Sequence, residues 1–284
     1  MILNKDNRML RRLVVVCLNN EKIFAHALKR ELNVPVEMSI IKEVTNSHEM
    51  DEIFNGFAGP FDIILYLMTY ESYGVLSTML TQNENIIKQR ALVVIPITIS
   101  PLKESPVMPF DFFTTLPVIS CTGKIQDISE RVSKLIKNYL HINLNDVNPL
   151  DFENLVKDVL KAYHFKEIMT CYSDHVNFGY DMMCSYLREG DGVKDNWLIE
   201  VKRIKEGRFT IRYIDTLIKQ SRSHYPTDSK VMLVTNGILT SVIVDYIENL
   251  QNEQDMSIYI VDGWKLCNLI ALNDNLMKEY FPYE

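Results

Sequence analysis

The 284-residue sequence lacks the two glycine-rich signatures of nucleotide-binding proteins. It contains neither G-x-G-x-x-G, which lets a helix N-terminus approach a dinucleotide, nor the phosphate-binding loop G-x-x-x-x-G-K-[ST]. Dinucleotide binding of the Rossmann type and P-loop nucleotide hydrolysis are therefore not indicated.

Long hydrophobic runs and paired cysteines are also missing. No apolar run approaches the roughly 18 residues that cross a bilayer, and the first residues show no apolar signal segment with a cleavage site. The five cysteines form no C-x-x-C pair, so neither a disulfide framework nor a zinc site is expected. The composition, 47% hydrophobic and 24% charged, is typical of a globular protein, which we expect in the cytoplasm without a membrane partner.

An overall excess of positive charge is absent, since the formal net charge is −7. Binding of nucleic acid by bulk electrostatics is therefore not favoured. One segment differs: between positions 202 and 222 seven basic residues stand against two acids, Glu206 and Asp215. The seven are Lys202, Arg203, Lys205, Arg208, Arg212, Lys219 and Arg222. This segment is either a phosphate-neutralising surface or an ordinary solvated helix face.

The first half of the chain predicts strands that alternate with helices. Apolar runs at 13–18, 61–67, 91–97 and 118–119 read as strands, and helical spacing follows at 23–32, 73–80 and 125–139. Asn19 and Asn20 offer an N-cap for the first helix, and Pro96 indicates a strand end or edge. Residues 1–140 are therefore predicted to form a doubly wound α/β domain with a parallel sheet.

A polar, turn-prone stretch at 141–149 predicts a linker to a second domain at 150–284. That domain begins with a helix for which Asp151 is the expected N-cap. Its apolar stripe consists of Phe152, Leu155, Val156, Val159, Leu160 and Tyr163.

The most informative stretch is 197–203, an apolar strand with one acid and one base. Period-two alternation places Glu200 and Lys202 on one face and Val201 on the other. A second strand-like run, 176–183, precedes a Gly- and Asp-rich turn, so the two runs predict an antiparallel hairpin in which Asp181 lies opposite Glu200. Like charges that lie opposite each other destabilise a hairpin, and a divalent cation such as Mg²⁺ bound between them would remove this repulsion. The alternative is a solvated edge face with a surface acid near a turn.

These residues resemble the PD-(D/E)xK nuclease superfamily, and more narrowly its Mrr-like restriction endonuclease branch. The resemblance covers about 150–270, and Asn177 stands where the family often has Asp. The matching pieces, in order, are Phe152-Glu153, Gly179-Tyr180-Asp181, Glu200-Val201-Lys202, Gln220, 231–237 and 260–263. The resemblance implies a restriction-endonuclease-like α/β domain with a mixed sheet.

The resemblance also implies roles for single residues. Asp181, Glu200 and the Val201 carbonyl would hold Mg²⁺, or alternatively Mn²⁺, and Lys202 would orient the attacking water and offset charge on the phosphate. Glu153 and Gln220 would help to hold the ion, a water or a phosphate. Alternatively, Glu153 complements the helix dipole and Gln220 is an exposed amide.

The implied substrate is double-stranded DNA, with Arg203, Lys205, Arg208, Arg212, Lys219 and Arg222 as candidate contacts. A nuclease controlled by its first domain suggests a prokaryotic anti-phage defence effector. The alternative is an inactive DNA-binding or scaffolding protein with a degenerate nuclease fold.

The first domain loosely resembles a TIR-like domain. The segment 73–79, where NAD-cleaving TIR domains carry their glutamate, contains no acid. An NAD-cleaving effector is thus the weaker alternative to a Rossmann-like sensor of a small nucleotide signal, or a domain that binds a partner protein. By fold geometry, a ligand would lie near the loops at 19–20, 68–72 and 98–100.

Three aromatic residues, Tyr280, Phe281 and Tyr283, stand near the C-terminus. They predict an exposed tail that packs against a partner chain, and hence a homo-oligomer.

Overall fold

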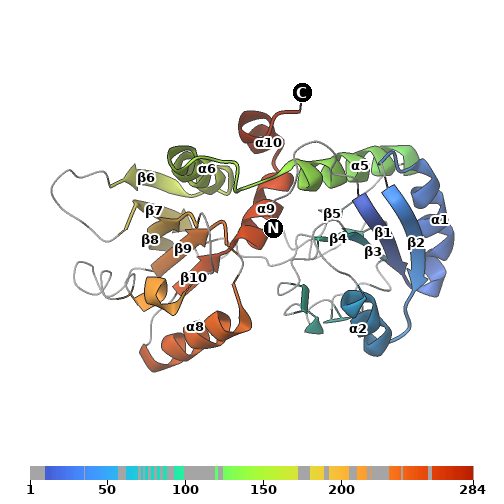
Figure 1. Ribbon diagram of the computed structural model, residues 1–284, viewed down its shortest axis with the longest axis horizontal. Helices are drawn as coiled ribbons and strands as arrows, with labels where there is room; N and C mark the ends of the chain where they lie inside the picture. Colours follow the sequence, from blue (N-terminus) through green and yellow to red (C-terminus); the bar gives the residue numbers. More distant parts are fainter. Residues whose placement is uncertain are drawn as a thin grey trace. The chain divides into compact units, whose positions relative to one another are not determined.

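The structure is a computed structural model, and it divides the chain into two compact units, Met1–Ile142 and Asn143–Glu284 (Figure 1). The division falls inside the stretch 141–149 that the sequence marks as a linker. No helix among the described residues is both long and apolar enough to cross a membrane. The described residues are 10–34, 36–56, 62–69, 93–98, 119–120, 124–171, 180–188, 192–204, 210–215, 230–237, 239–254 and 258–283, with single positions at 72–87 and 218.

Unit 1 contains a five-stranded sheet in the order β2-β1-β3-β4-β5, in which every described pairing is parallel. The fold class predicted for this half, a doubly wound parallel sheet, is confirmed. The elements are β1 (Leu10–Cys17), a 3-10 turn η1 (Asn19–Glu21), α1 (Lys22–Glu31), β2 (Val36–Glu43), α2 (Ser47–Asn55), β3 (Asp62–Met68), β4 (Val93–Thr98), β5 (Ile119–Ser120) and α5 (Ile125–His141).

Strands β1 and β3 form the centre of unit 1 because both are buried on both faces. Residues 13–17 and 63–68 are at most 2% exposed, as expected for strands between two layers of helices. Helices α1 and α5 lie together on one side of the sheet and α2 lies on the other (Figure 1). Pro96 aligns with Tyr66 of β3 and lies two residues before the end of β4, near a strand end as predicted. Position 118, which would align with Pro96 on the β5 side, lies outside the described residues.

Two sequence predictions in unit 1 are wrong. Asn19 and Asn20 lie in η1 and do not cap α1, whose N-cap position is Glu21. Ile23 was expected on the buried helix face and is 85% exposed, whereas Ala25 and Leu28 are buried. The sequence analysis also missed β2 and α2. Most of the helix expected at 73–80 lies outside the described residues.

Unit 2 contains a second five-stranded sheet in the order β10-β9-β8-β7-β6. Strand β7 runs antiparallel to β6 and β8, while β8, β9 and β10 are parallel, so the predicted mixed sheet is confirmed. The elements are α6 (Pro149–Ala162), β6 (Lys166–Thr170), β7 (Met182–Leu187), β8 (Lys194–Lys202), β9 (Lys230–Thr235), α8 (Ser241–Gln254), β10 (Ile258–Val261), α9 (Gly263–Ala271) and α10 (Asp274–Tyr280).

Helix α6 begins earlier than predicted. Asn148 is its N-cap and accepts a hydrogen bond from the Asp151 amide, and Pro149 occupies the first turn, where a missing N–H costs nothing. The expected apolar stripe is buried from Phe152 to Leu160. On the sheet, α8 lies on one side, and α6 and α9 lie on the other (Figure 1).

The C-terminal tail packs on its own unit, contrary to the prediction. Phe281 is 6% exposed, and the Tyr280 hydroxyl donates to Asp158 of α6 at 2.6 Å. Only Tyr283 of the three aromatics is exposed, at 50%. The tail therefore no longer supports the expected homo-oligomer.

The turn between β10 and α9 is held close to the end of β9. The Gly263 amide donates to the Gly237 carbonyl at 2.8 Å, and Asp262 caps α9 through the Lys265 amide. A Cβ at Gly263 would lie 2.2 Å from the Asn236 carbonyl oxygen, which is backbone and cannot rotate away. Glycine is therefore required at this position.

We predict that Gly263→Ala lowers the free energy of unfolding of unit 2 by about 1–3 kcal/mol, because the backbone must shift to admit the methyl group. Urea unfolding followed by circular dichroism measures the change. Gly74→Ala is the control, since nothing lies within 4 Å of that Cβ and the position is an exposed helical one, so this variant should keep or slightly raise the midpoint. Equal midpoints for both variants would contradict the close approach.

Candidate active site

The hairpin that the sequence predicts at the centre of unit 2 is confirmed. Strands β7 and β8 pair antiparallel, and the described pairing ends with Met182 opposite Ile199. Asp181 precedes β7, and its amide bonds the carbonyl of Ile199, the residue before Glu200, so the predicted opposition of Asp181 and Glu200 stays a prediction. Strand β7 begins at Met182, later than expected, and positions 176–179 of the predicted strand lie outside the described residues.

Asp181 is fastened to β8 by two hydrogen bonds. Its amide donates to the Ile199 carbonyl at 2.9 Å, and its Oδ2 accepts the Val201 amide at 2.6 Å. The carboxylate therefore lies against the backbone between Glu200 and Lys202. Burial raises the pKa of Asp181, while the Val201 amide and the charge of Lys202 oppose this increase.

Glu200 and Lys202 project from the same face of β8, as predicted. Both strands of a parallel pair present aligned residues on one face, and Glu200 aligns with Leu233 and Lys202 with Thr235 of β9. Leu233 belongs to the cluster that packs under α8, so the charged pair lies on the α8 side of the sheet. Val201, 8% exposed, lies on the opposite face.

Glu200 has a strongly raised pKa, because it is half-buried and close to other acids. Its pKa is raised from 4.5 to about 7, first because burial penalises the carboxylate, then because of the nearby charge of Asp181. Glu153 of α6 adds a smaller increase and Lys202 opposes it. The structure thus brings together the four charged residues that the sequence selected, Glu153, Asp181, Glu200 and Lys202. Their catalytic roles remain predictions.

A divalent cation fits the oxygen donors of this site. Two carboxylates, Asp181 and Glu200, lie where a positive charge would remove their mutual repulsion, and hard oxygen ligands are those that Mg²⁺ prefers. No group of three or more His, Cys, Asp or Glu side chains among the described residues is close enough to hold a metal. An ion here would therefore complete its coordination with backbone oxygen, such as the Val201 carbonyl, and water.

Tyr213 is a neighbour of the site that lies in the basic segment 202–222. Ile214 and Ile218 of the same segment are buried. Tyr213 is 39% exposed, and the Lys202 ammonium lies 5.4 Å from the centre of its ring. This distance is that of a cation–π contact, which restricts where the ammonium can lie.

Asn236 holds the backbone that follows Lys202. Its Oδ1 accepts the Ile204 amide at 2.7 Å, and its Nδ2 donates to the Ile204 carbonyl at 3.0 Å. The same Nδ2 donates to Asn145 Oδ1 at 2.9 Å. In the sequence Asn236 appears only within the matching piece 231–237, because nothing in a linear pattern shows which backbone an amide side chain will reach.

The predicted nucleic-acid contacts are only partly described. Arg203 donates from Nη2 to the Asn145 carbonyl at 2.8 Å, and its Nε is buried without a hydrogen-bond partner. Part of its donor capacity is therefore used within the protein. Arg212 is exposed. Gln220 and four of the basic residues, Lys205, Arg208, Lys219 and Arg222, lie outside the described residues.

A known protein family matches this part of the chain. Residues 144–270 match the model of the Mrr_cat family, described as a restriction endonuclease. Unit 2 therefore carries a restriction endonuclease domain, and the resemblance seen in the sequence is confirmed for it.

One solved structure found by fold comparison is "MspJI Restriction Endonuclease in Complex with 27-mer Oligonucleotide", with 8% sequence identity and a TM-score of 0.34. The alignment covers 54% of this chain and 33% of that chain, so it spans about a third of the length of the solved protein. The curated proteins give no match. The TIR-like resemblance of residues 1–140 finds no support in these comparisons.

The raised pKa of Glu200 predicts a stability effect. The pKa of Glu200 is higher in the folded protein, about 7, than in the unfolded chain, about 4.5. Below pH 4.5 the carboxyl is protonated in both states and costs no stability, whereas between pH 4.5 and 7 the free energy of unfolding falls as the pH rises. At pH 8 with EDTA, Glu200→Gln should therefore raise the melting temperature, by about 2–4 °C for a protein of this size. At pH 5 the difference should nearly vanish.

Differential scanning calorimetry measures this effect, with Glu248→Gln on the exposed side of α8 as the matched control. The control should melt like the wild type at both pH values. If Glu200→Gln destabilises the protein at pH 8, the carboxylate is better solvated than the structure indicates.

Proposed function

We propose that the protein is a metal-dependent DNA endonuclease that hydrolyses phosphodiester bonds, with Mg²⁺ as the expected ion and Mn²⁺ as a substitute. The single observation that carries this proposal is the pair of half-buried acids, Asp181 and Glu200, close to Lys202: Glu200 and Lys202 lie on β8, and Asp181 is hydrogen-bonded to the residue between them. This pair lies within a restriction endonuclease domain. Keeping two mutually repelling acids and a lysine together is costly for a structural role and useful for hydrolysis of a phosphodiester.

In this proposal the acids bind the metal ion, and the lysine acts on the water and the phosphate. Bound to Asp181, Glu200 and the Val201 carbonyl, the ion would supply positive charge to the scissile phosphate. Lys202 holds a fixed positive charge next to the acids, where it orients the attacking water and stabilises charge that develops on the phosphate oxygens. Glu153, whose charge reaches Glu200 from α6, positions a water or the ion. Double-stranded DNA is the proposed substrate.

Basic residues near the site provide the remaining contacts. Exposed Arg212, with Lys205, Arg208, Lys219 and Arg222 of the same basic segment, would neutralise DNA phosphates. No reading of base sequence is proposed for them. Gln220 is proposed to steady the water or a phosphate, as the resemblance implies.

A defence role is the biological setting that we propose. A nuclease unit joined to a separate doubly wound unit suits an anti-phage effector whose rate of cutting is controlled by unit 1. The alternative is an inactive DNA-binding scaffold, which the repelling acid pair disfavours, because a scaffold gains nothing from keeping it.

We predict that the full-length protein nicks supercoiled plasmid with Mg²⁺ or Mn²⁺ and not with EDTA, as resolved by agarose gel electrophoresis. Glu200→Ala and Lys202→Ala should each lower the rate by about a hundredfold or more, because each removes charge aimed at the reacting phosphate. Glu248→Ala on α8 is the control and should cut normally. Unchanged cutting by Lys202→Ala would show that the site lies elsewhere.

Tyr213 should act on cleavage through Lys202. Tyr213→Phe keeps the aromatic face and should cut at the wild-type rate, whereas Tyr213→Leu loses the cation–π contact and should lower kcat by about threefold to tenfold. KM for plasmid should stay within a factor of two, since the ring restrains the ammonium rather than binding DNA. A loss of cutting in Tyr213→Phe as well would instead assign the hydroxyl a role.

A further inference from the structure

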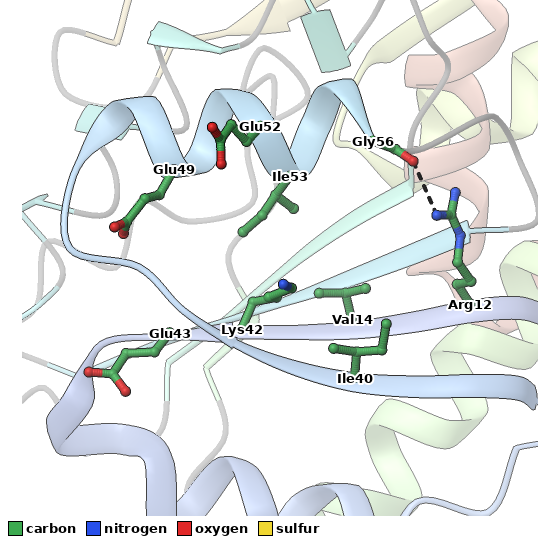
Figure 2. Close-up of a pocket in the computed structure, with 9 residues that line it drawn as sticks. All are labelled: Arg12, Val14, Ile40, Lys42, Glu43, Glu49, Glu52, Ile53 and Gly56. Carbon is green, nitrogen blue, oxygen red and sulfur yellow. Dashed lines mark hydrogen bonds between the residues drawn. The ribbon is translucent and has the colours of Figure 1, made fainter.

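A cavity of about 370 Å³ lies in unit 1 between α2 and the β1–β2 edge of the sheet (Figure 2). Its volume is within the range of small-molecule sites in proteins, about 300–1,000 Å³. The loops at 19–20, 68–72 and 98–100, where fold geometry predicted a ligand, contribute none of their described residues to its lining. It is therefore a site that the sequence did not indicate.

The middle of the cavity is apolar. Val14 of β1 and Ile40 of β2 align in the parallel register and project from the same face, and Ile53 of α2 points down towards them (Figure 2). These three side chains form a surface on which a hydrocarbon or aromatic group would be shielded from water.

Two cations come from the same face of the sheet. Arg12 precedes Val14 by two residues and Lys42 follows Ile40 by two, so period-two alternation places both with the apolar floor. Along the strands they are about 13 Å apart. The Arg12 guanidinium donates from Nη1 to the Gly56 carbonyl at 3.1 Å and so closes one end of the cavity.

Lys42 is the cation of the cavity lining whose charge has no acidic partner among the described residues. Its ammonium lies below Ile53 and beside Val14 (Figure 2). Lys42 is exposed, and in the part of the chain that the structure describes its ammonium makes neither a hydrogen bond nor an ion pair. A cation held over an apolar floor without a partner is an attractive position for an anion.

The acids of the lining are occupied elsewhere. Glu43 pairs with Lys22 at 3.0 Å, and Glu49 accepts the Thr45 amide at 2.7 Å, which lowers the pKa of Glu49. Both carboxylates point away from the apolar floor (Figure 2). Glu52, on the rim, lies 3.6 Å from a His48 ring nitrogen and is the one acid that opposes an anion here.

We propose that this cavity binds a small organic anion, with a carboxylate, sulfonate or phosphate group on Lys42 and an apolar or aromatic body over Val14, Ile40 and Ile53. The proposal assigns unit 1 a ligand site that is separate from the acids of unit 2 and does not depend on nuclease activity.

The test uses two fluorescent probes with the same aromatic skeleton. 8-Anilinonaphthalene-1-sulfonate carries the anion, and N-phenyl-1-naphthylamine lacks it. The full-length protein should bind the sulfonate at one site, and Lys42→Gln should weaken that binding by about tenfold, the usual size of one charge-assisted contact. Lys42→Arg should restore it, and Glu52→Gln should strengthen it.

Two controls separate this site from others. Lys137→Gln, an exposed lysine of α5 outside the cavity, should bind like the wild type. Ile53→Phe fills the cavity without changing any charge, and should weaken the sulfonate probe as well. The proposal is overturned if Lys42→Gln binds the sulfonate as the wild type does, or if the neutral probe binds as tightly as the sulfonate.

Discussion

The hydrogen bond from the Val201 amide to the Asp181 carboxylate is the contact on which the arrangement of unit 2 depends. At 2.6 Å it fixes one acid on the backbone of β8, at the residue between Glu200 and Lys202. Glu200 is half-buried near this second carboxylate, and burial together with the charge of Asp181 raises its pKa to about 7. The repulsion follows from the fold, because the hydrogen bonds of Asp181 to Ile199 and Val201 hold its carboxylate beside the backbone of Glu200.

The layers of both units follow from hydrophobic patterning, and most of them could be predicted. The runs at 13–18 and 61–67 are apolar throughout, and a strand buried between two helical layers requires this pattern. Strand β2 was missed because Glu37, Ser39 and Lys42 interrupt its apolar residues, as is common in an edge strand with one neighbour. The caps were wrong for a different reason: several polar residues stand near each helix start, and only local backbone geometry selects one.

The candidate site could be predicted as far as one hairpin. Period-two alternation and the turn at 188–196 predicted that Asp181, Glu200 and Lys202 lie together, because the three residues are close to one another in the sequence. What surrounds them could not be predicted in the same way. Tyr213 reaches Lys202 from a helix on the α8 side, and Asn236 reaches Ile204 from the end of β9. Such contacts depend on how elements pack, and a sequence pattern shows only which face of each element is apolar.

The hairpin also has a consequence for the order in which the site can assemble. Asp181 and Glu200 are separated by 19 positions, whereas the β8–β9 pairing joins Leu198 to Val231, 33 positions apart. Loop-closure entropy increases with the length of the closed segment, so the hairpin forms at the lower entropic cost. If the hairpin forms first, as this lower cost favours, the two acids meet while water still hydrates both of them. Their repulsion reaches its full strength only later, when the apolar cluster under α8 removes that water.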